Sequence, residues 1–258
     1  MPIRPAPMSS TFRDRKPDLM SKALRLSFDD AYLIGGARTP FVDYRGAFAK
    51  ISPIDLGIKA ARAAIERTGV KPCEIGSTVV GSMAQASFDA YLTPRHVGIY
   101  AGADTEAPAH LVQRICGTGI EIIAQAADSV SLGRVDLALA AGTESMSRNP
   151  IAAYTHRNGF PMAKLEFKGF LWEALYDPAG DVTMGDTAEN LSKQYSIPRE
   201  RVDRFAEQSF NRAIAARDAG ILAEEIVPVV SESFAIEGMG TRGIRLPRVP
   251  MPSIAKLS

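Results

Sequence analysis

The 258-residue chain is short of cysteine, histidine and tryptophan, with two, three and one of each. Its two cysteines, Cys73 and Cys116, lie far apart without metal-site spacing, which favours a reducing compartment and predicts no bound metal. A formal net charge of +1 gives no electrostatic basis for binding nucleic acid or an anionic membrane. No apolar run approaches the roughly 18 residues of a transmembrane helix, so we expect no membrane span.

The rest of the composition is 46% hydrophobic and 23% charged, which is typical of a soluble globular protein with one large core or two modest ones. Residues 1–29 differ, because they are rich in arginine and lysine and contain no secretory apolar region. We predict a disordered leader over residues 1–29. A cytoplasmic location is expected, and a mitochondrial one is the alternative, since a basic start also fits a presequence.

From Asp30 the pattern alternates between short apolar runs and helical repeats. Helices are predicted from Ser52 to Gly69, from Thr93 to Gly102, and from Cys116 to about Leu132, with Ser52 as an N-cap and glycines as stops. The predicted strands are Ala31–Gly35, Ser77–Gly81, His110–Arg114 and Val135–Gly142. Apolar strands separated by helices predict an α/β fold with a parallel or mixed sheet, covered on both faces, over residues 30–147.

A second, smaller and mostly helical unit is predicted over residues 148–248. Its periodic segments are expected helices at Asp186–Tyr195 and Arg199–Asp218 and an expected strand at Glu225–Val230. The last ten residues, 249–258, fit no element and are interpreted as an atypical tail.

Cys116 is the candidate nucleophile, because it lies where a predicted strand passes into a helix. The positive end of a helix and its unpaired N–H groups favour a thiolate, and Gly117 and Gly119 leave room for a carbonyl to approach the backbone. The alternative is a buried, inert cysteine. Glu144 is interpreted as a hydrogen-bonding turn residue, or as one that orients the Cys116 loop. The helix after Cys116 is apolar on several sides and is predicted to be buried all round.

Five landmarks in order resemble the thiolase family, whose members make or cleave 3-ketoacyl-CoA. They are Ala37–Phe41 with Arg45-Gly46, the Cys-Gly-Thr-Gly motif at 116–119, Ala141–Ser147, Met184–Asn190, and the helix through Asp203 followed by Glu225–Pro228. The resemblance implies a layered α/β/α half-domain with a mixed, mainly parallel sheet, and a loop domain that covers coenzyme A. Gln113 and Ile122 depart from the usual residues near the nucleophile and are expected to alter the substrate pocket.

The resemblance also implies an acetyl-CoA C-acyltransferase activity in fatty-acid metabolism, with coenzyme A as a substrate and no prosthetic group. In this interpretation Cys116 is the catalytic nucleophile and its N–H is part of the oxyanion hole. Gly117, Thr118, Gly119 and Glu144 support the site, and Met184 lies beside the channel for the acyl or pantetheine chain. The direction of the reaction and the acyl chain length stay open.

Only the N-terminal half-domain and the loop domain of the family are matched. None of the three histidines (His96, His110, His156) lies in the family's Gly-His-Pro motif, and Cys73 is not followed by its glycine run. We therefore expect the chain to be weakly active or inactive alone, poorly soluble, and either a homo-oligomer or dependent on a thiolase C-terminal half. The alternatives are a non-catalytic subunit or degenerate fragment that binds CoA or acyl groups, and a ketoacyl-synthase relative.

Overall fold

The computed structural model describes residues 27–28, 30–84, 87–154, 157, 159, 162 and 166–247. Its centre is a parallel three-stranded sheet in the order β2–β1–β3, formed by β1 (Ser77–Gly81), β2 (Ala109–Val112) and β3 (Ala138–Gly142). All five residues of β1 are buried, as expected of the middle strand of a covered sheet. The predicted α/β fold with a parallel sheet is confirmed.

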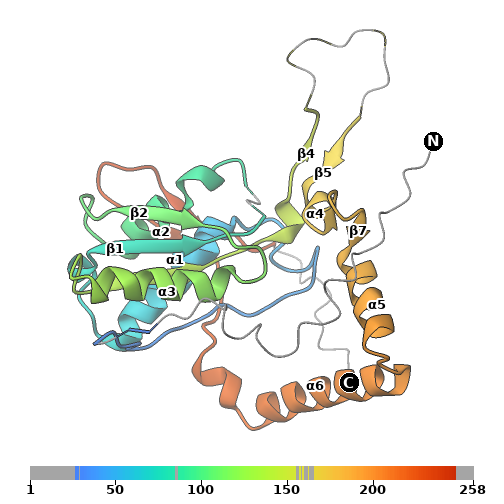
Figure 1. The fold of residues 1–258 in the computed structure, drawn as a ribbon. Helices are drawn as coiled ribbons and strands as arrows, with labels where there is room; N and C mark the ends of the chain where they lie inside the picture. Colours follow the sequence, from blue (N-terminus) through green and yellow to red (C-terminus); the bar gives the residue numbers. More distant parts are fainter. Residues whose placement is uncertain are drawn as a thin grey trace.

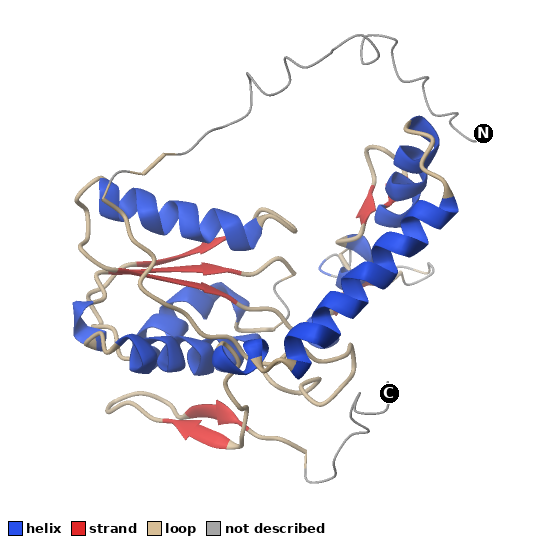
Figure 2. Ribbon diagram, turned by 90° about the horizontal axis from the view of Figure 1, so that it is seen from below, coloured by secondary structure: helices blue, strands red, loops and turns tan. Residues whose placement is uncertain are grey.

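Helices cover both faces of this sheet (Figure 2). On one face lie α1 (Pro53–Thr68) and α2 (Thr93–Ala101), and on the other lies α3 (Thr118–Ser131). The predicted ends of α1 are confirmed: the Ser52 hydroxyl accepts the Ile54 N–H at 3.2 Å, and Gly69 adopts a left-handed φ of 69°. These caps satisfy backbone groups that the helix itself leaves unpaired.

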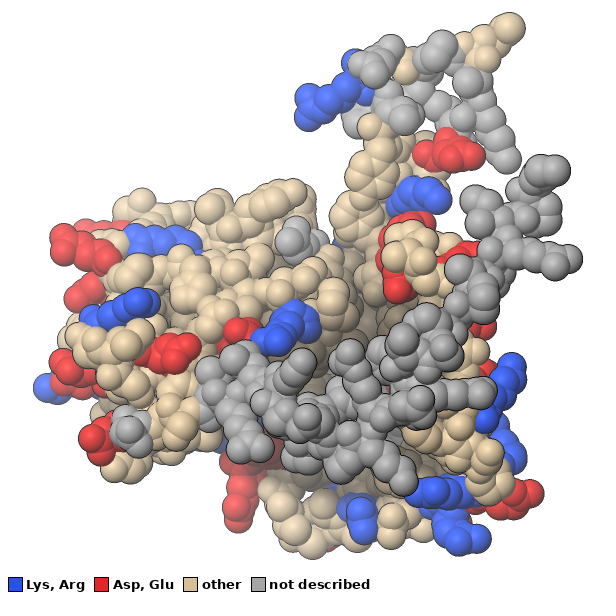
Figure 3. All heavy atoms as spheres, viewed as in Figure 1, with Lys and Arg blue, Asp and Glu red and all other residues tan. Residues whose placement is uncertain are grey.

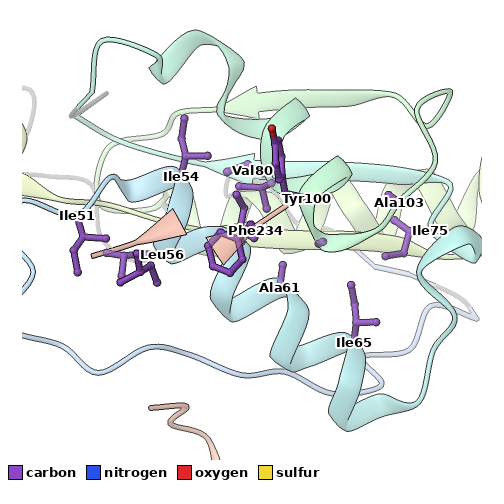
Figure 4. Packing of buried hydrophobic residues seen from close by; sticks show 14 residues of the cluster. Ile51, Ile54, Leu56, Ala61, Ile65, Ile75, Val80, Tyr100, Ala103 and Phe234 are labelled. Carbon is purple, nitrogen blue, oxygen red and sulfur yellow. The ribbon is translucent and has the colours of Figure 1, made fainter. Parts of the chain in front are cut away.

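An antiparallel hairpin adds a further layer outside α1. It consists of β8 (Glu232–Phe234) and β9 (Arg242–Ile244). The side chains of Phe234 and Ile244 are fully buried in the same core as Ile54, and Figure 4 shows Phe234 among the residues of α1 and α2. The end of the predicted second unit thus returns to the first, although the division at residue 148 stays a prediction.

Two predicted strands are wrong. Residues 31–35 form no strand, and of the segment 225–230 only Ile226 makes a β-bridge, with Arg38. Arg38 N–H donates to the Glu225 carbonyl at 2.9 Å, and the Arg38 guanidinium pairs with the Glu225 carboxylate at 2.9 Å. The segment 225–230 therefore pairs at a single point with Arg38, which follows the segment 31–35, instead of extending the sheet.

The remaining elements lie outside the sheet, and the two longest of them, both helices, extend away from it (Figure 1). They are the two-residue pairs β4 (Ile151–Ala152) with β5 (Lys168–Gly169) and β6 (Tyr176–Asp177) with β7 (Val182–Thr183), the helices α4 (Phe170–Glu173), α5 (Met184–Gln194) and α6 (Arg199–Asp218), and the 3₁₀ turns η3 (Pro72–Glu74), η4 (Ala90–Leu92), η5 (Met146–Arg148) and η7 (Ile221–Glu224). Helix α6 has the predicted bounds. Helix α5 begins two residues earlier than predicted, because Thr183 and Asp186 form a capping box.

Helix α3, whose apolar pattern predicts burial all round, is only partly buried in this chain. Its buried residues are Thr118, Ile122, Ala124 and Ala126, whereas Ile120 is 79% exposed and Ile123 51% exposed. Ile122 and Ala126 pack against the sheet, whereas Ile120 and Ile123 are left exposed. Figure 3 shows the face of the molecule on which the outer side of α3 lies. Uncharged surface lies there between scattered charged residues. No helix in the described part is long and apolar enough to cross a membrane, and the described residues hold no group of three potential metal ligands.

A network of charges ties the hairpin to α1. Arg242 Nε lies 2.9 Å from Asp55 Oδ1, and Arg242 Nη1 lies 2.9 Å from Asp89 Oδ2. Burial raises the pKa of Asp55, outweighing Arg242, whereas hydrogen bonds from Ser87 and Arg242 outweigh burial at Asp89 and lower its pKa. Burial and the nearby Arg242 both lower the pKa of His96 below its ordinary 6.5.

The lowered pKa of His96 predicts a loss of stability in mild acid. The unfolded chain binds a proton at this histidine before the folded chain does, so stability present above pH 6.5 is lost as the pH falls below that value. In urea titrations between about pH 7.5 and 5, His96→Asn is expected to flatten this dependence. The exposed His110 provides the control, His110→Asn. Identical profiles for His96→Asn and the parent chain would contradict the assignment.

Candidate active site

Cys116 lies in the turn between β2 and α3, at the carboxyl end of a parallel strand, where ligands bind in open α/β sheets. Its side chain is exposed, as is the whole segment 113–117. Helix α3 begins at Thr118 with Gly117 as its N-cap, so the thiol lies one residue before the cap. The expected position at a helix start is confirmed, and the alternative of a buried cysteine is wrong.

The residue before the thiol has an unusual backbone. Ile115 has a φ of 47°, in the left-handed region that β-branched residues rarely adopt. Such a conformation costs of order 1–3 kcal/mol and persists only where the surroundings hold it. Here Thr118 Oγ1 accepts the Arg114 N–H at 2.8 Å and donates to the Ile115 carbonyl at 2.6 Å. Thr118 therefore holds the turn that presents Cys116.

Thr118 can reach this position because β1 ends in glycine. A Cβ on Gly81 would lie 2.6 Å from Thr118 Cγ2 and 3.0 Å from Ile122 Cγ2, closer than real contacts allow. Ile122 is buried between α3 and the sheet, so it packs in the core beneath the turn. Ile122 is thus a core residue next to Thr118 at Gly81, and its effect on a substrate pocket stays a prediction.

A hydroxyl-deleting change should loosen this turn. In Thr118→Val the shape is kept, but the Arg114 N–H loses its acceptor, which is expected to cost about 0.5–1.5 kcal/mol of unfolding free energy. Thr118→Ser keeps the hydroxyl and is the matched control. Urea unfolding measures the loss, and the rate of Cys116 alkylation reports on the turn. Equal stability of the Val and Ser variants would show that the hydroxyl does not hold the turn.

Glu144 follows β3 and organises the loop after β1. Its Oε2 accepts the N–H groups of Met83 and Ala84 at 2.9 and 2.8 Å, and its Oε1 accepts the Ser145 N–H at 3.1 Å. Gln113 Nε2 in turn donates to the Met83 carbonyl at 3.2 Å. Glu144 is thus a hydrogen-bonding turn residue, connected to the Cys116 turn through Met83 and Gln113.

The other predicted site residues are Gly117, Gly119 and Met184. A Cβ on Gly119 would meet no atom within 4 Å, so the space beside its backbone is open, whereas one on Gly117 would touch the Arg114 carbonyl at an ordinary 3.4 Å. Met184 begins α5, half exposed, and α5 stands apart from the β2–α3 turn in both ribbon views (Figures 1 and 2). The role of Met184 in a channel stays a prediction.

The histidines do not supply a partner for the thiol in the described residues. His110 Nε2 lies 3.0 Å from Gln125 Oε1 on α3, and His96 belongs to the Arg242 network on the other side of the sheet. His156 lies outside the described residues. The strained φ of Ile115 and the Gln113–Met83 contact were not predicted. The Cys-Gly-Thr-Gly pattern carried one signal for the turn, a hydroxyl two residues after the cysteine.

Comparison with known proteins agrees with this geometry. The family model of the thiolase N-terminal domain matches residues 31–238. The chain belongs to the thiolase family. It is 38% identical over 199 residues to the mitochondrial 3-ketoacyl-CoA thiolase of Mus musculus, covering 77% of this chain and 50% of the relative. The beta-ketothiolase BktB of Cupriavidus necator is 37% identical over 204 residues, covering 79% and 52%.

Solved thiolase structures share the fold. Human mitochondrial 3-ketoacyl-CoA thiolase in complex with CoA superimposes with a TM-score of 0.74 at 33% identity, covering 82% of this chain and 52% of that one. The acetyl-CoA acetyltransferase of Syntrophomonas wolfei gives 0.72 at 33% identity, covering 85% and 53%. The chain thus spans about half the length of the thiolases it matches, and it matches their N-terminal part.

Proposed function

We propose that this chain is the cysteine-bearing half of a thiolase-type acyltransferase, which accepts an acyl group from acyl-CoA or 3-ketoacyl-CoA on Cys116. The observation that carries the proposal is the exposed thiol one residue before the N-cap of α3, in a turn held by Thr118. Membership of the family supplies the substrate class, because relatives with this N-terminal half are named 3-ketoacyl-CoA thiolases and acetyl-CoA acetyltransferases.

The proposed half-reaction is an exchange of thioesters. The Cys116 thiolate attacks the carbonyl carbon of the acyl-CoA, a new C–S bond forms, and the bond to the CoA sulfur breaks, so that CoA leaves as a thiolate and takes up a proton. Negative charge that develops on the carbonyl oxygen needs N–H donors. The Cys116 N–H and the open backbone at Gly119 are the groups that this turn offers.

A thiol and part of an oxyanion hole do not complete a thiolase. Covalent catalysis of this kind also requires a base for the thiol and a proton shuttle. The described histidines lie elsewhere: His110 bonds to Gln125, and His96 lies beside Arg242. We therefore propose that acylation is slow in the isolated chain, and that turnover depends on a partner that supplies the groups of a thiolase C-terminal half.

The second candidate is a subunit that binds CoA or acyl groups without chemistry. The exposed apolar face of α3, with Ile120 and Ile123, would be covered by a partner chain under either candidate, so it supports a subunit role without separating the two. The two candidates differ in one respect. Only the acyltransferase forms a covalent adduct on Cys116.

Acylation can be measured with an internal control, because both cysteines are exposed. After incubation with acetyl-CoA, mass spectrometry of the intact chain and its peptides is expected to place one acetyl group on Cys116 ahead of Cys73. Cys116→Ser should show no early adduct. Equal modification of Cys73 and Cys116 would indicate ordinary thiol reactivity and remove the support for a nucleophile. CoA binding without an adduct would favour the non-catalytic subunit.

A further inference from the structure

A series of side-chain contacts spans the turn that carries Cys116. Arg114, two residues before the cysteine, forms an ion pair through its Nη1 with Oε2 of Glu121, which lies in the first turn of α3. Gln125 Nε2 donates to Oε1 of the same carboxylate at 3.0 Å, and Gln125 Oε1 lies 3.0 Å from His110 Nε2 on β2. The contacts thus connect the strand before the turn with the helix after it.

Both members of the ion pair lie close to the reactive position. Their backbones are bonded to Gly117, the residue that follows Cys116: the Gly117 N–H donates to the Arg114 carbonyl at 3.0 Å, and the Gly117 carbonyl accepts the Glu121 N–H at 3.1 Å. The Arg114 N–H is in turn held by the Thr118 hydroxyl at 2.8 Å. Arg114 is therefore fixed to the start of α3 by its backbone and by its side chain.

Glu121 places a negative charge at the start of the helix. Hydrogen bonds from Gln125 and Arg114 lower the pKa of Glu121, so the carboxylate is ionised at neutral pH. Acyl transfer to Cys116 requires a thiolate and develops further negative charge on the carbonyl oxygen. An unpaired carboxylate near the thiol would repel both, because like charges at short range raise the energy of the charged state.

The Arg114–Glu121 pair does little for the stability of the fold. The Arg114 side chain is 59% exposed and that of Glu121 is 21% exposed, and solvent screens an ion pair in such a place. A local electrostatic effect is a better reason for its position, because the guanidinium offsets the one carboxylate that the first turn of α3 contains.

We propose that Arg114 is a positioning residue, which neutralises Glu121 and so sets the charge felt at the Cys116 thiol. In the parent chain the start of α3 can then accept negative charge. The use of this charge in acylation rests on the proposed function. The charge itself can be measured without acyl-CoA.

Alkylation by neutral iodoacetamide and by anionic iodoacetate measures the charge at each cysteine. Mass spectrometry of the peptides gives the ratio of the iodoacetate rate to the iodoacetamide rate. At Cys116 this ratio is expected to fall about two- to fivefold in Arg114→Gln, to rise by a similar factor in Glu121→Gln, and to return to the parent value in the double variant. A purely structural tie would change both single variants in the same direction, without recovery in the double variant.

Two controls accompany the measurement. Arg199→Gln breaks an exposed ion pair of the same kind, with Asp203 on α6 at 2.6 Å, and should leave the ratio at Cys116 unchanged. The exposed Cys73 reports on the same molecules, and its ratio should stay constant in all variants. An unchanged ratio at Cys116 in Arg114→Gln, or no recovery in the double variant, overturns the proposal.

Acetylation by acetyl-CoA separates this inference from the proposed function. Arg114→Gln is expected to acetylate Cys116 about two- to fivefold more slowly than the parent, and the double variant should recover. Shifted alkylation ratios in a chain that forms no acetyl adduct would support the role of Arg114 and refute acyl transfer. Normal acetylation in a chain whose alkylation ratio ignores Arg114→Gln would keep the proposed function and remove the role of Arg114.

Discussion

Cleavage of a 3-ketoacyl-CoA by the isolated chain is expected to be about 10³- to 10⁶-fold slower than by a full-length thiolase. The chain presents Cys116 but brings no described histidine to it. Loss of a partner from a cooperating catalytic set commonly raises the barrier by about 4–8 kcal/mol, which corresponds to this range of rates. Steady-state thiolysis with CoA and a 3-ketoacyl-CoA, at equal concentrations of the two proteins, measures the difference.

A separately produced C-terminal half of a thiolase supplies the matched test. Mixed with the chain, it is expected to raise the rate if the exposed side of α3 can receive it, and the gain should vanish with Cys116→Ser. Cys73→Ser, which removes the other exposed thiol, should leave the gain intact. A rate for the chain alone within tenfold of the full-length enzyme, abolished by Cys116→Ser, would refute the need for a second half.

Local signals in the sequence predicted α1 and β1 well, because each is complete within a short stretch. Ser52 and Gly69 cap α1 with their own side chain and backbone, and β1 is a short uncharged run of small and β-branched residues, all of them buried. The strand expected at residues 31–35 did not form, because a strand also depends on pairing with a segment distant in the sequence, and the local pattern does not show whether that pairing occurs. Tyr32 and Leu33 remain exposed in this chain.

Long-range contacts explain what the sequence did not reveal about the site. The position of Cys116 at a helix start follows from the local pattern, but the left-handed Ile115 depends on Thr118, and Thr118 depends on the missing Cβ of Gly81, more than 30 residues away. Glu144 was predicted as a turn residue. Its partners are the N–H groups of Met83 and Ala84 in the loop after β1. They come close to Glu144 because β1 pairs with β3, which the local sequence does not show.

Phe234→Ala is expected to destabilise the chain by about 3–5 kcal/mol, the cost of deleting a fully buried ring. The ring packs in the core with Ile54 and Ile58, and the Arg62 guanidinium lies 4.8 Å from its centroid. The substitution would leave a cavity between the hairpin and α1 and remove the cation–π contact. Because native domains have only about 5–15 kcal/mol of stability, the loss is a large fraction of the total.

The exposed Phe210 on α6 provides the matched control, since Phe210→Ala deletes the same atoms at a solvent-facing site and should change stability by less than about 0.5 kcal/mol. Phe234→Leu, which refills most of the volume, should fall between the two and keeps the comparison measurable if Phe234→Ala does not fold. Urea unfolding followed by circular dichroism gives all three values. Equal losses for Phe234→Ala and Phe210→Ala would mean that the hairpin is not part of the core formed by the sheet and α1.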